Sequence, residues 1–333
     1  MKHSNISIFI PHIGCPNRCS FCNQNSISST LNIPSIESIR KTLSKALHEF
    51  KGDLSNSQIA FFGGSFTAIK RDYMISLLEV ANEYIGKDMF SSIRISTRPD
   101  YINDEILEIL DYYNVKSIEL GAQSMNDKTL LMNRRGHTSK DIVDASVSIL
   151  SKGFELGLQM MVGLYGDTEE TILDTAEKFV LLKPNTVRIY PTLVLKNTHL
   201  ETLYTNKKYI PMGLDETISI CSELIGIFQR NNIKVIKLGL HESQTVKEDF
   251  LAGPYHPAFR ELCESNIFIK SLFEKLKIHE KGKYIIYVNP RFVSKAVGQN
   301  RKNIFFLEQR GYSVNFSEKE DVEVGMFEIT KGD

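Results

Sequence analysis

Six short apolar runs, separated by amphipathic stretches, limit the fold of this chain more than any other feature. The runs are rich in Ile, Val, Leu and Phe and mostly lack alternation, which is typical of strands buried on both faces of a parallel sheet. Between and after them, apolar residues recur every three or four positions, as on one face of a helix, for example at 36–50, 74–84 and 218–228. The runs themselves are residues 7–13, 58–64, 93–97, 117–122, 156–164 and 186–191.

Six consecutive strand–helix units predict an α/β fold with right-handed crossovers. Periodicity alone leaves an open doubly wound sheet and a curved partial barrel as alternatives. In both, functional residues collect at the carboxyl ends of the strands. Asp167 followed by Glu170 predicts a capping box that opens a helix near 168–182.

Composition sets wider bounds on the chain. Its 333 residues are 42% apolar, enough for one large core or a core with a small second domain. Lys and Arg number 40, as do Asp and Glu, so net charge neither favours nor excludes a nucleic-acid partner. The start resembles no signal peptide and no apolar run is long enough to span a bilayer, so we expect a cytoplasmic protein with reduced thiols and no membrane association.

Three of the five cysteines fall within one short stretch, GCPNRCSFC, at Cys15, Cys19 and Cys22. The C-x3-C-x2-C spacing fits no common zinc pattern, because such patterns supply four ligands in two pairs. Three thiolates on one loop can instead bind three irons of a 4Fe–4S cluster and leave the fourth iron open. A three-cysteine zinc site and unliganded thiols are the structural alternatives.

This spacing, with Phe21 directly before the last cysteine, resembles the signature of the radical S-adenosylmethionine enzymes. The resemblance implies a partial (β/α)6 TIM-like barrel in which the open iron chelates the amino and carboxylate groups of S-adenosylmethionine. One electron, from a donor such as flavodoxin or ferredoxin, would then cleave the cofactor to a 5′-deoxyadenosyl radical that abstracts hydrogen from a substrate.

The loops after the predicted strands supply candidate cofactor-binding residues. The resemblance implies that a glycine pair receives the methionine amino group, while polar residues flanking the end of the fourth strand suit the ribose hydroxyls. An arginine could pair with the methionine carboxylate, and a glycine after the fifth strand could let the backbone approach adenine. Ordinary turns, helix caps and a solvated basic loop are the structural alternatives. These candidates are Gly63, Gly64, Glu119, Gln123, Arg135 and Gly163.

Four ordered motifs narrow the resemblance to the radical domain of the catalytic subunit of Elongator, which modifies the wobble uridine of tRNA. They are TRPDY, ELGAQS, RRGHT and IYPTLVLKNT, and the resemblance covers roughly residues 5–205. The chain departs from that family at Val162–Gly166, where a proline-flanked glycine turn is expected. Fewer than a hundred residues follow residue 240, so we expect no acetyltransferase domain and do not carry over acetyl-coenzyme A chemistry.

We expect a core barrel in residues 1–240 and a C-terminal extension in residues 241–333. Within the extension, residues 283–317 are predicted as strand, helix, a GQNR turn, helix and strand, the core order of a KH module whose GXXG loop clamps nucleic-acid backbone. Residues 281–310 hold seven Lys or Arg and one Glu. Arg301 stands where the second glycine is expected, and a plain cap on the barrel is the alternative.

The leading hypothesis is a radical enzyme that uses a 4Fe–4S cluster and S-adenosylmethionine to modify tRNA. A radical enzyme acting on a small molecule such as a porphyrinogen is the second hypothesis. An RNA-binding protein with a structural or sensory iron–sulfur cluster is the third. The residues do not identify the atom attacked, the group transferred or the oligomeric state.

Overall fold

The computed structural model describes residues 4–11, 15–16, 18–23, 33–50, 53–240 and 244–332. The chain forms two compact units, one comprising Met1–Met212 with Ile227–Tyr255 and the other Gly213–Gly226 with His256–Asp333. The domain boundary expected after residue 240 borders residues 241–243, which lie outside the described residues, and it stays a prediction.

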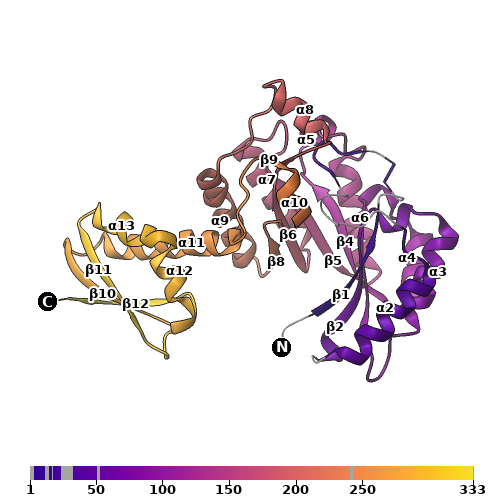
Figure 1. The fold of residues 1–333 in the computed structure, drawn as a ribbon, viewed down its shortest axis with the longest axis horizontal. Helices are drawn as coiled ribbons and strands as arrows, with labels where there is room; N and C mark the ends of the chain where they lie inside the picture. The colour runs from indigo at the N-terminus through magenta and orange to yellow at the C-terminus, as the bar shows by residue number, and fades with distance from the viewer. Residues whose placement is uncertain are drawn as a thin grey trace. The chain divides into compact units, whose positions relative to one another are not determined.

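A seven-stranded sheet, curled into a half-barrel, organises the first unit (Figure 1). Its strands are all parallel and lie side by side in chain order. They are β1 (Ser4–Ile10), β2 (Ser57–Gly63), β3 (Ser92–Thr97), β4 (Val115–Gln123), β5 (Glu155–Val162), β6 (Thr186–Pro191) and β8 (Lys234–Leu238). All their carboxyl ends therefore meet at one edge, as an α/β fold requires of a functional site.

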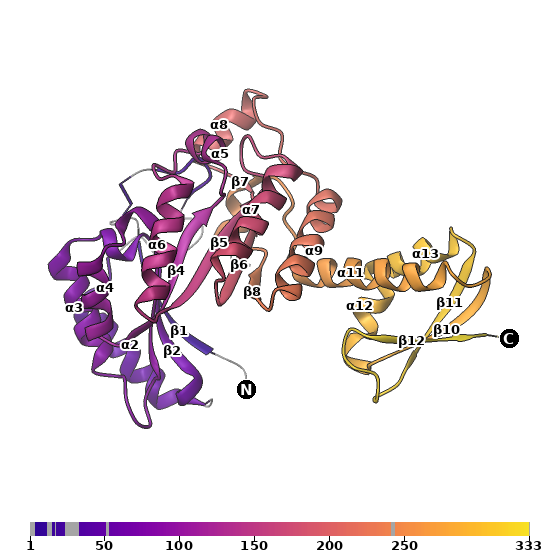
Figure 2. The same cartoon turned by 180° about the vertical axis from the view of Figure 1, so that it is seen from behind.

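Long helices alternate with these strands, and Figures 1 and 2 show α2, α3, α4 and α6 on the outer side of the sheet. Shorter elements follow at the carboxyl ends of the strands. The helices are α2 (Ile36–Glu49), α3 (Arg71–Asn82), α4 (Asp104–Tyr112), α5 (Asp127–Met132), α6 (Ser139–Ser151), α7 (Glu169–Leu182), α8 (His199–Thr205), α9 (Leu214–Arg230) and α10 (Gln244–Asp249). Two short strands, β7 (Val194–Leu195) and β9 (Phe250–Ala252), pair antiparallel.

Burial on both faces explains why the strands lack alternation. Ile59, Ala60 and Phe61, three consecutive residues of β2, are all fully buried, and so are Leu77 and Leu78 on α3. The outer face of the sheet packs against helices, and its inner face forms the interior of the half-barrel. The partial TIM-like barrel predicted for the chain is therefore confirmed.

Two local predictions need correction. The strand β8, KVIKL, was not predicted, because five residues with lysine at the first and fourth positions carry little apolar signal. The capping box of α7 was assigned to Asp167 and Glu170, and this is wrong. Thr168 is the N-cap and its partner is Thr171, while Asp167 accepts a hydrogen bond from the backbone N–H of Leu164 at 2.9 Å.

The inner face of the half-barrel carries a buried network of charges around Glu119. Its carboxylate lies 2.9 Å from Arg94 Nη1 and 2.6 Å from Arg188 Nε. The amide of Gln159 donates to it at 3.2 Å. Arg94 also reaches Glu155 at 3.5 Å and Gln58 at 2.8 Å. Buried charges persist only when they are paired in this way.

The second unit has its own small sheet and core. Strand β10 (Gly282–Val288) lies between β11 (Tyr312–Glu318), to which it is parallel, and β12 (Phe327–Lys331), to which it is antiparallel. Helices α11 (Phe259–Leu276), α12 (Val293–Val297) and α13 (Lys302–Glu308), with the part of α9 up to Gly226, complete the unit. Phe268, Leu272, Ile286 and Leu307 belong to one buried cluster. The order β10–α12–turn–α13–β11 matches the elements expected in 283–317, whereas nucleic-acid binding by them stays a prediction.

Throughout the described part of the chain, no helix is both long and apolar enough to cross a bilayer.

Replacing Glu119 tests the charge network of the half-barrel. The Glu119→Gln variant leaves two buried arginines with too little negative charge, so we expect the free energy of unfolding of the first unit to fall by about 3–5 kcal/mol. Urea denaturation followed by circular dichroism measures the change. Glu105→Gln is the matched control, because Glu105 is 70% exposed and pairs with Arg71 at the surface, where such pairs contribute about 0–1 kcal/mol. Equal, small losses in the two variants would contradict the assignment.

Candidate functional site

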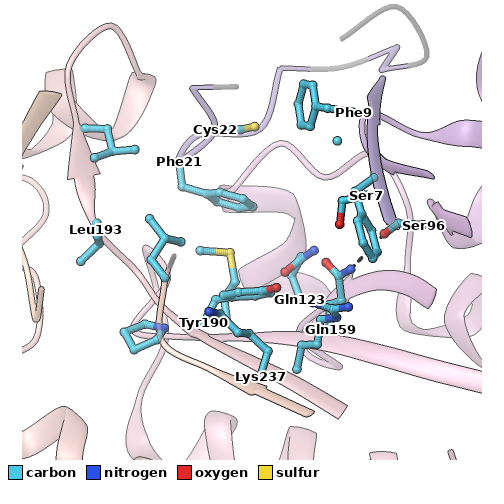
Figure 3. Close-up of a pocket in the computed structure, with 17 residues that line it drawn as sticks. Ser7, Phe9, Phe21, Cys22, Ser96, Gln123, Gln159, Tyr190, Leu193 and Lys237 are labelled. Carbon is cyan, nitrogen blue, oxygen red and sulfur yellow. Dashed lines mark hydrogen bonds between the residues drawn. The ribbon is translucent and has the colours of Figure 1, made fainter. Parts of the chain in front are cut away.

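A cavity of about 580 Å³ lies within the half-barrel and opens among its strand ends. Strands β1 to β6 and β8 all contribute lining residues. Figure 3 shows Phe21 and Cys22 on one side of this cavity and Tyr190 and Lys237 on the opposite side, with Gln123 and Gln159 between them. The cysteine stretch therefore borders a space large enough for a small-molecule ligand.

The cysteine stretch is anchored through Ser20, which is fully buried. Its backbone N–H donates to Asn133 O at 3.1 Å and its hydroxyl donates to Asn133 Oδ1 at 2.6 Å. Its own carbonyl accepts from the backbone N–H of Leu200 at 2.7 Å. The residue after Cys19 is thus tied to the C-terminal end of α5 and to the first turn of α8, which fixes the loop beside the cavity.

Cys15, Cys19 and Cys22 are half-buried and form no disulfide. Burial raises the pKa of Cys15 and of Cys22, and the neighbouring Cys19 thiol raises both further. The three thiols are therefore close enough to interact electrostatically. Across the described ranges, however, no group of three His, Cys, Asp or Glu side chains is arranged to hold a metal ion. Metal binding by these cysteines stays a prediction.

Arg135 is the residue of the predicted set that contacts the cysteines. It is buried, its Nη1 donates to Cys19 Sγ at 3.0 Å, and its Nη2 donates to Gly121 O. Its Nε is buried and has no hydrogen-bond partner. A buried cation beside a thiol stabilises a thiolate or another anionic group at this position. Three cysteine thiols with an adjacent arginine therefore fit a negatively charged iron–sulfur centre.

The glycine pair after β2 owes its residue type to the neighbouring strand. A Cβ on Gly63, whose φ is +112°, would lie 2.4 Å from Ile10 O, and one on Gly64 would lie 3.0 Å from Pro11 O. The backbone N–H of Gly64 donates to Ile10 O at 2.7 Å. Gly63 also lines the cavity. Side chains here would displace the chain that leads into the cysteines, as well as any cofactor in the cavity.

The remaining predicted residues are distributed differently. Gln123 lines the cavity and has φ of +72°, at the end of β4 where the pairing with β5 shifts register. Glu119 does not line the cavity, because its carboxylate is held by Arg94 and Arg188. Gly163 lies outside the lining too, and its carbonyl accepts from the Tyr209 hydroxyl at 2.6 Å.

Sequence reasoning missed several inward-facing residues of the cavity. Arg188 and Tyr190 on β6 and Gln159 on β5 all line it. Burial raises the pKa of the Tyr190 phenol. Arg188 is the register partner of Lys237 on β8, and its guanidinium lies 5.0 Å from the Phe62 ring centroid. The sequence did carry a signal for this: in RIY the polar residues stand two positions apart, and such residues point to the same face of a strand.

His137 lies behind the strand ends among charged neighbours. Burial, together with Arg135 and Arg98, lowers its pKa to about 4 against the opposing effects of the Ala122 carbonyl and Asp100. Arg98 itself is held by Asp100 at 2.9 and 2.8 Å. His137 is therefore neutral at pH 7 and adds no positive charge beside the cysteines.

Comparison with known protein families and structures agrees with this geometry. Residues 9–179 match the model of the Radical SAM superfamily, and residues 184–268 match the Radical_SAM C-terminal domain. In a Methanocaldococcus infernus Elp3 lacking its N-terminus, the fold is similar with a TM-score of 0.63 at 17% identity, covering 84% of this chain and 65% of that one. Streptococcus suis SuiB gives a TM-score of 0.53 at 13% identity, covering 73% and 50%.

Relatives by sequence include an uncharacterized protein of Methanocaldococcus jannaschii, 29% identical over 66% of this chain and 65% of that protein. The tRNA uridine(34) acetyltransferase of the same organism is 29% identical over 38% of this chain and 24% of its own length. Human Elongator complex protein 3 is 23% identical over 50% and 34%. The chain thus spans about a quarter to two thirds of these relatives. The match to the superfamily model covers just over half of the chain, and the chain belongs to the Radical SAM superfamily.

Proposed function

We propose that this chain holds a 4Fe–4S cluster on Cys15, Cys19 and Cys22, cleaves S-adenosylmethionine reductively and modifies a tRNA. The observation that carries the proposal is the anchored cysteine stretch at the wall of a 580 Å³ cavity inside the half-barrel. When bound, the cluster supplies the electron that splits the sulfonium bond of S-adenosylmethionine. The protein's task is to bind, orient and exclude water.

The cavity residues can perform that task in distinct ways. Gly63 and Gln123 line the same cavity as Cys22, and we assign them to the amino and ribose groups of the cofactor. The Phe9, Phe21 and Phe62 side chains limit access of water to the same space. Glu119 acts through Arg188, whose guanidinium it holds at 2.6 Å on the cavity wall. Gly64 and Gly163 do not line this cavity, so the cofactor contacts expected of them stay predictions.

A tRNA substrate is supported by two independent features. The four motifs shared with Elongator-type proteins include residues of the cavity wall, Gln123 and Tyr190 among them. The cavity also combines aromatic faces with the amide of Gln159, and an unstacked base is recognised by stacking and hydrogen bonding of this kind.

The second unit offers a basic turn for the phosphate backbone. Gly298 and Asn303 define this turn, and the Asn303 amide donates to Lys295 O at 3.2 Å and Ala296 O at 2.9 Å. Arg301 and Lys302 are exposed there, and Lys302 lies 2.7 Å from Asp215. Lys295 pairs with Glu264 at 2.5 Å and both side chains are under 30% exposed, whereas the side chains of the Lys302–Asp215 pair are 70% and 82% exposed, so Arg301 and Lys302 are the better candidates for phosphate contact.

A small anionic substrate is the second candidate. Arg188 and Lys237 both line the cavity, and the described lining residues include no Asp or Glu. A carboxylate-bearing molecule such as a porphyrinogen would find complementary charge there. Under either candidate, an external one-electron donor such as flavodoxin or ferredoxin and a cytoplasmic location remain proposals.

The cysteine assignment predicts the behaviour of five variants. Anaerobically reconstituted protein should bind about four irons, and with dithionite and S-adenosylmethionine it should release 5′-deoxyadenosine. Cys15→Ala, Cys19→Ala and Cys22→Ala should each lose both properties. Cys221→Ala and Cys263→Ala should retain them, because these two thiols are fully buried in the second unit. Iron analysis and chromatography of the nucleoside product are the measurements. Loss of iron in either of the last two variants would refute the ligand assignment.

The tRNA assignment predicts a salt-dependent contribution from the basic turn. Each phosphate contact to a single strand lowers the slope of log affinity against log salt by about 0.7. The double variant Arg301→Ala/Lys302→Ala should therefore bind tRNA more weakly and raise the negative slope toward zero by about one to two. Filter binding at several salt concentrations measures both quantities.

Lys319→Ala/Lys331→Ala is the matched control for this experiment, because these lysines belong to the same unit, lie outside the basic turn and pair with Glu328 and Glu280. This control should bind tRNA as the unmodified chain does. If tRNA binding is at background, or if the double variant has the same affinity and salt slope as the unmodified chain, the small anionic substrate is favoured instead.

A further inference from the structure

Arg135 differs from the other buried arginines of the first unit in lacking a carboxylate. Arg94 and Arg188 pair with Glu119, and Arg98 pairs with Asp100. No carboxylate among the described residues pairs with Arg135, which is 6% exposed. A guanidinium buried without a counter-anion costs several kcal/mol. Its charge therefore calls for an anionic group that is not a side-chain carboxylate.

The contacts of Arg135 identify where that group lies. One terminal nitrogen donates to Cys19 Sγ at 3.0 Å, and the other donates to the carbonyl of Gly121. The third nitrogen, Nε, is buried without a partner. Arg135 does not line the cavity. Its guanidinium is thus committed to the cysteine sulfur rather than presented to a ligand in the cavity.

The backbone holds this arginine in place. Helix α5 ends at Met132, and Arg134 takes a left-handed conformation with φ of +56°. The backbone N–H of Arg135 then donates to Leu130 O at 3.0 Å. Asn133, two residues earlier, anchors Ser20, which follows Cys19 in the chain. The contact between Asn133 and Ser20 therefore positions both Arg135 and Cys19, which lie within two residues of them in the chain. The fold of the loop thus fixes the contact between Arg135 and Cys19.

We propose that Arg135 is the counter-cation of the iron–sulfur cluster and makes its one-electron reduction easier. The inference rests on the cluster of the proposed function. Reduction adds one negative charge, which a fixed cation in a buried site stabilises more than it stabilises the oxidised form. Hydrogen bonds to the cysteine sulfurs and the net charge nearby are among the factors that set cluster potentials. Arg135 accordingly acts through its fixed positive charge beside the cluster. This role differs from the one expected from the motifs, which was to bind the methionine carboxylate.

The test compares the midpoint potential of the reconstituted cluster in the full chain and in Arg135→Gln. Samples are poised with dithionite and redox mediators, and the reduced cluster is quantified by electron paramagnetic resonance. We expect the ratio of reduced to oxidised cluster at a given potential to fall at least tenfold, which is 59 mV for a one-electron couple. Arg135→Lys keeps the charge and should restore at least half of this shift, whereas a structural role for the guanidinium would give no such rescue.

Arg134→Gln is the matched control, because Arg134 is exposed and its guanidinium contacts His199 at 3.0 Å rather than a cysteine. It should leave the potential unchanged. An unchanged potential in Arg135→Gln with full iron content would overturn the inference, and a loss of S-adenosylmethionine affinity in that sample would assign Arg135 to the carboxylate. Iron loss in both Arg135 variants would also overturn it, by showing that Arg135 only holds the loop. Absence of a cluster in the unmodified chain would instead overturn the proposed function, and the inference with it.

Discussion

The half-barrel depends on the pairing of one buried carboxylate, Glu119, with guanidinium groups from two other strands. Glu119 lies on β4, and its partners Arg94 and Arg188 lie on β3 and β6. Apolar side chains alone would have filled the interior of the half-barrel, as they fill the centres of small closed barrels. A satisfied polar network instead occupies part of the inner face, where each buried charge has a partner. The cavity beside the cysteines adjoins this network, because Arg188 and Gln159 line the cavity and also contact Glu119.

The cysteine stretch depends on contacts made by segments far away in the chain. Asn133 after α5 and Leu200 at the start of α8 both bind Ser20. The backbone N–H of Gly64 donates to Ile10 O, at the end of β1, at 2.7 Å. Arg135 adds the one buried positive charge that contacts a cysteine sulfur within the described residues. Anchoring and charge thus come from the same turn, which connects the fold of the half-barrel to the chemistry proposed for the loop.

The sequence was most informative where a pattern is local. Apolar runs predicted six of the seven strands of the sheet, and the spacing of Cys15, Cys19 and Cys22 led to the superfamily that the family comparison shows. The short strand β8 escaped because its lysines dilute the apolar signal. At the start of α7, Asp167 and Thr168 are both good caps, and only the backbone decides that Thr168 takes the position.

Partnerships between distant strands could not be predicted in this way. Nothing near Glu119 in the chain indicates that Arg94 and Arg188 would bind it, because the three residues meet only through the register of the sheet. The contact between Arg135 and Cys19 likewise joins residues 116 positions apart. The glycine pair was expected to serve a cofactor, which stays a prediction, and the close carbonyls of Ile10 and Pro11 are a second reason for glycine that only the structure reveals.

The central claim is that the anchored cysteines generate a radical that modifies tRNA, and nucleoside mass spectrometry of tRNA tests it most directly. Total tRNA from a strain lacking this chain would be compared with tRNA from strains complemented with the unmodified chain or with Cys19→Ala. The account predicts that one modified uridine disappears in the deletion strain, returns with the unmodified chain and stays absent with Cys19→Ala. Identical nucleoside profiles in all three strains would contradict it.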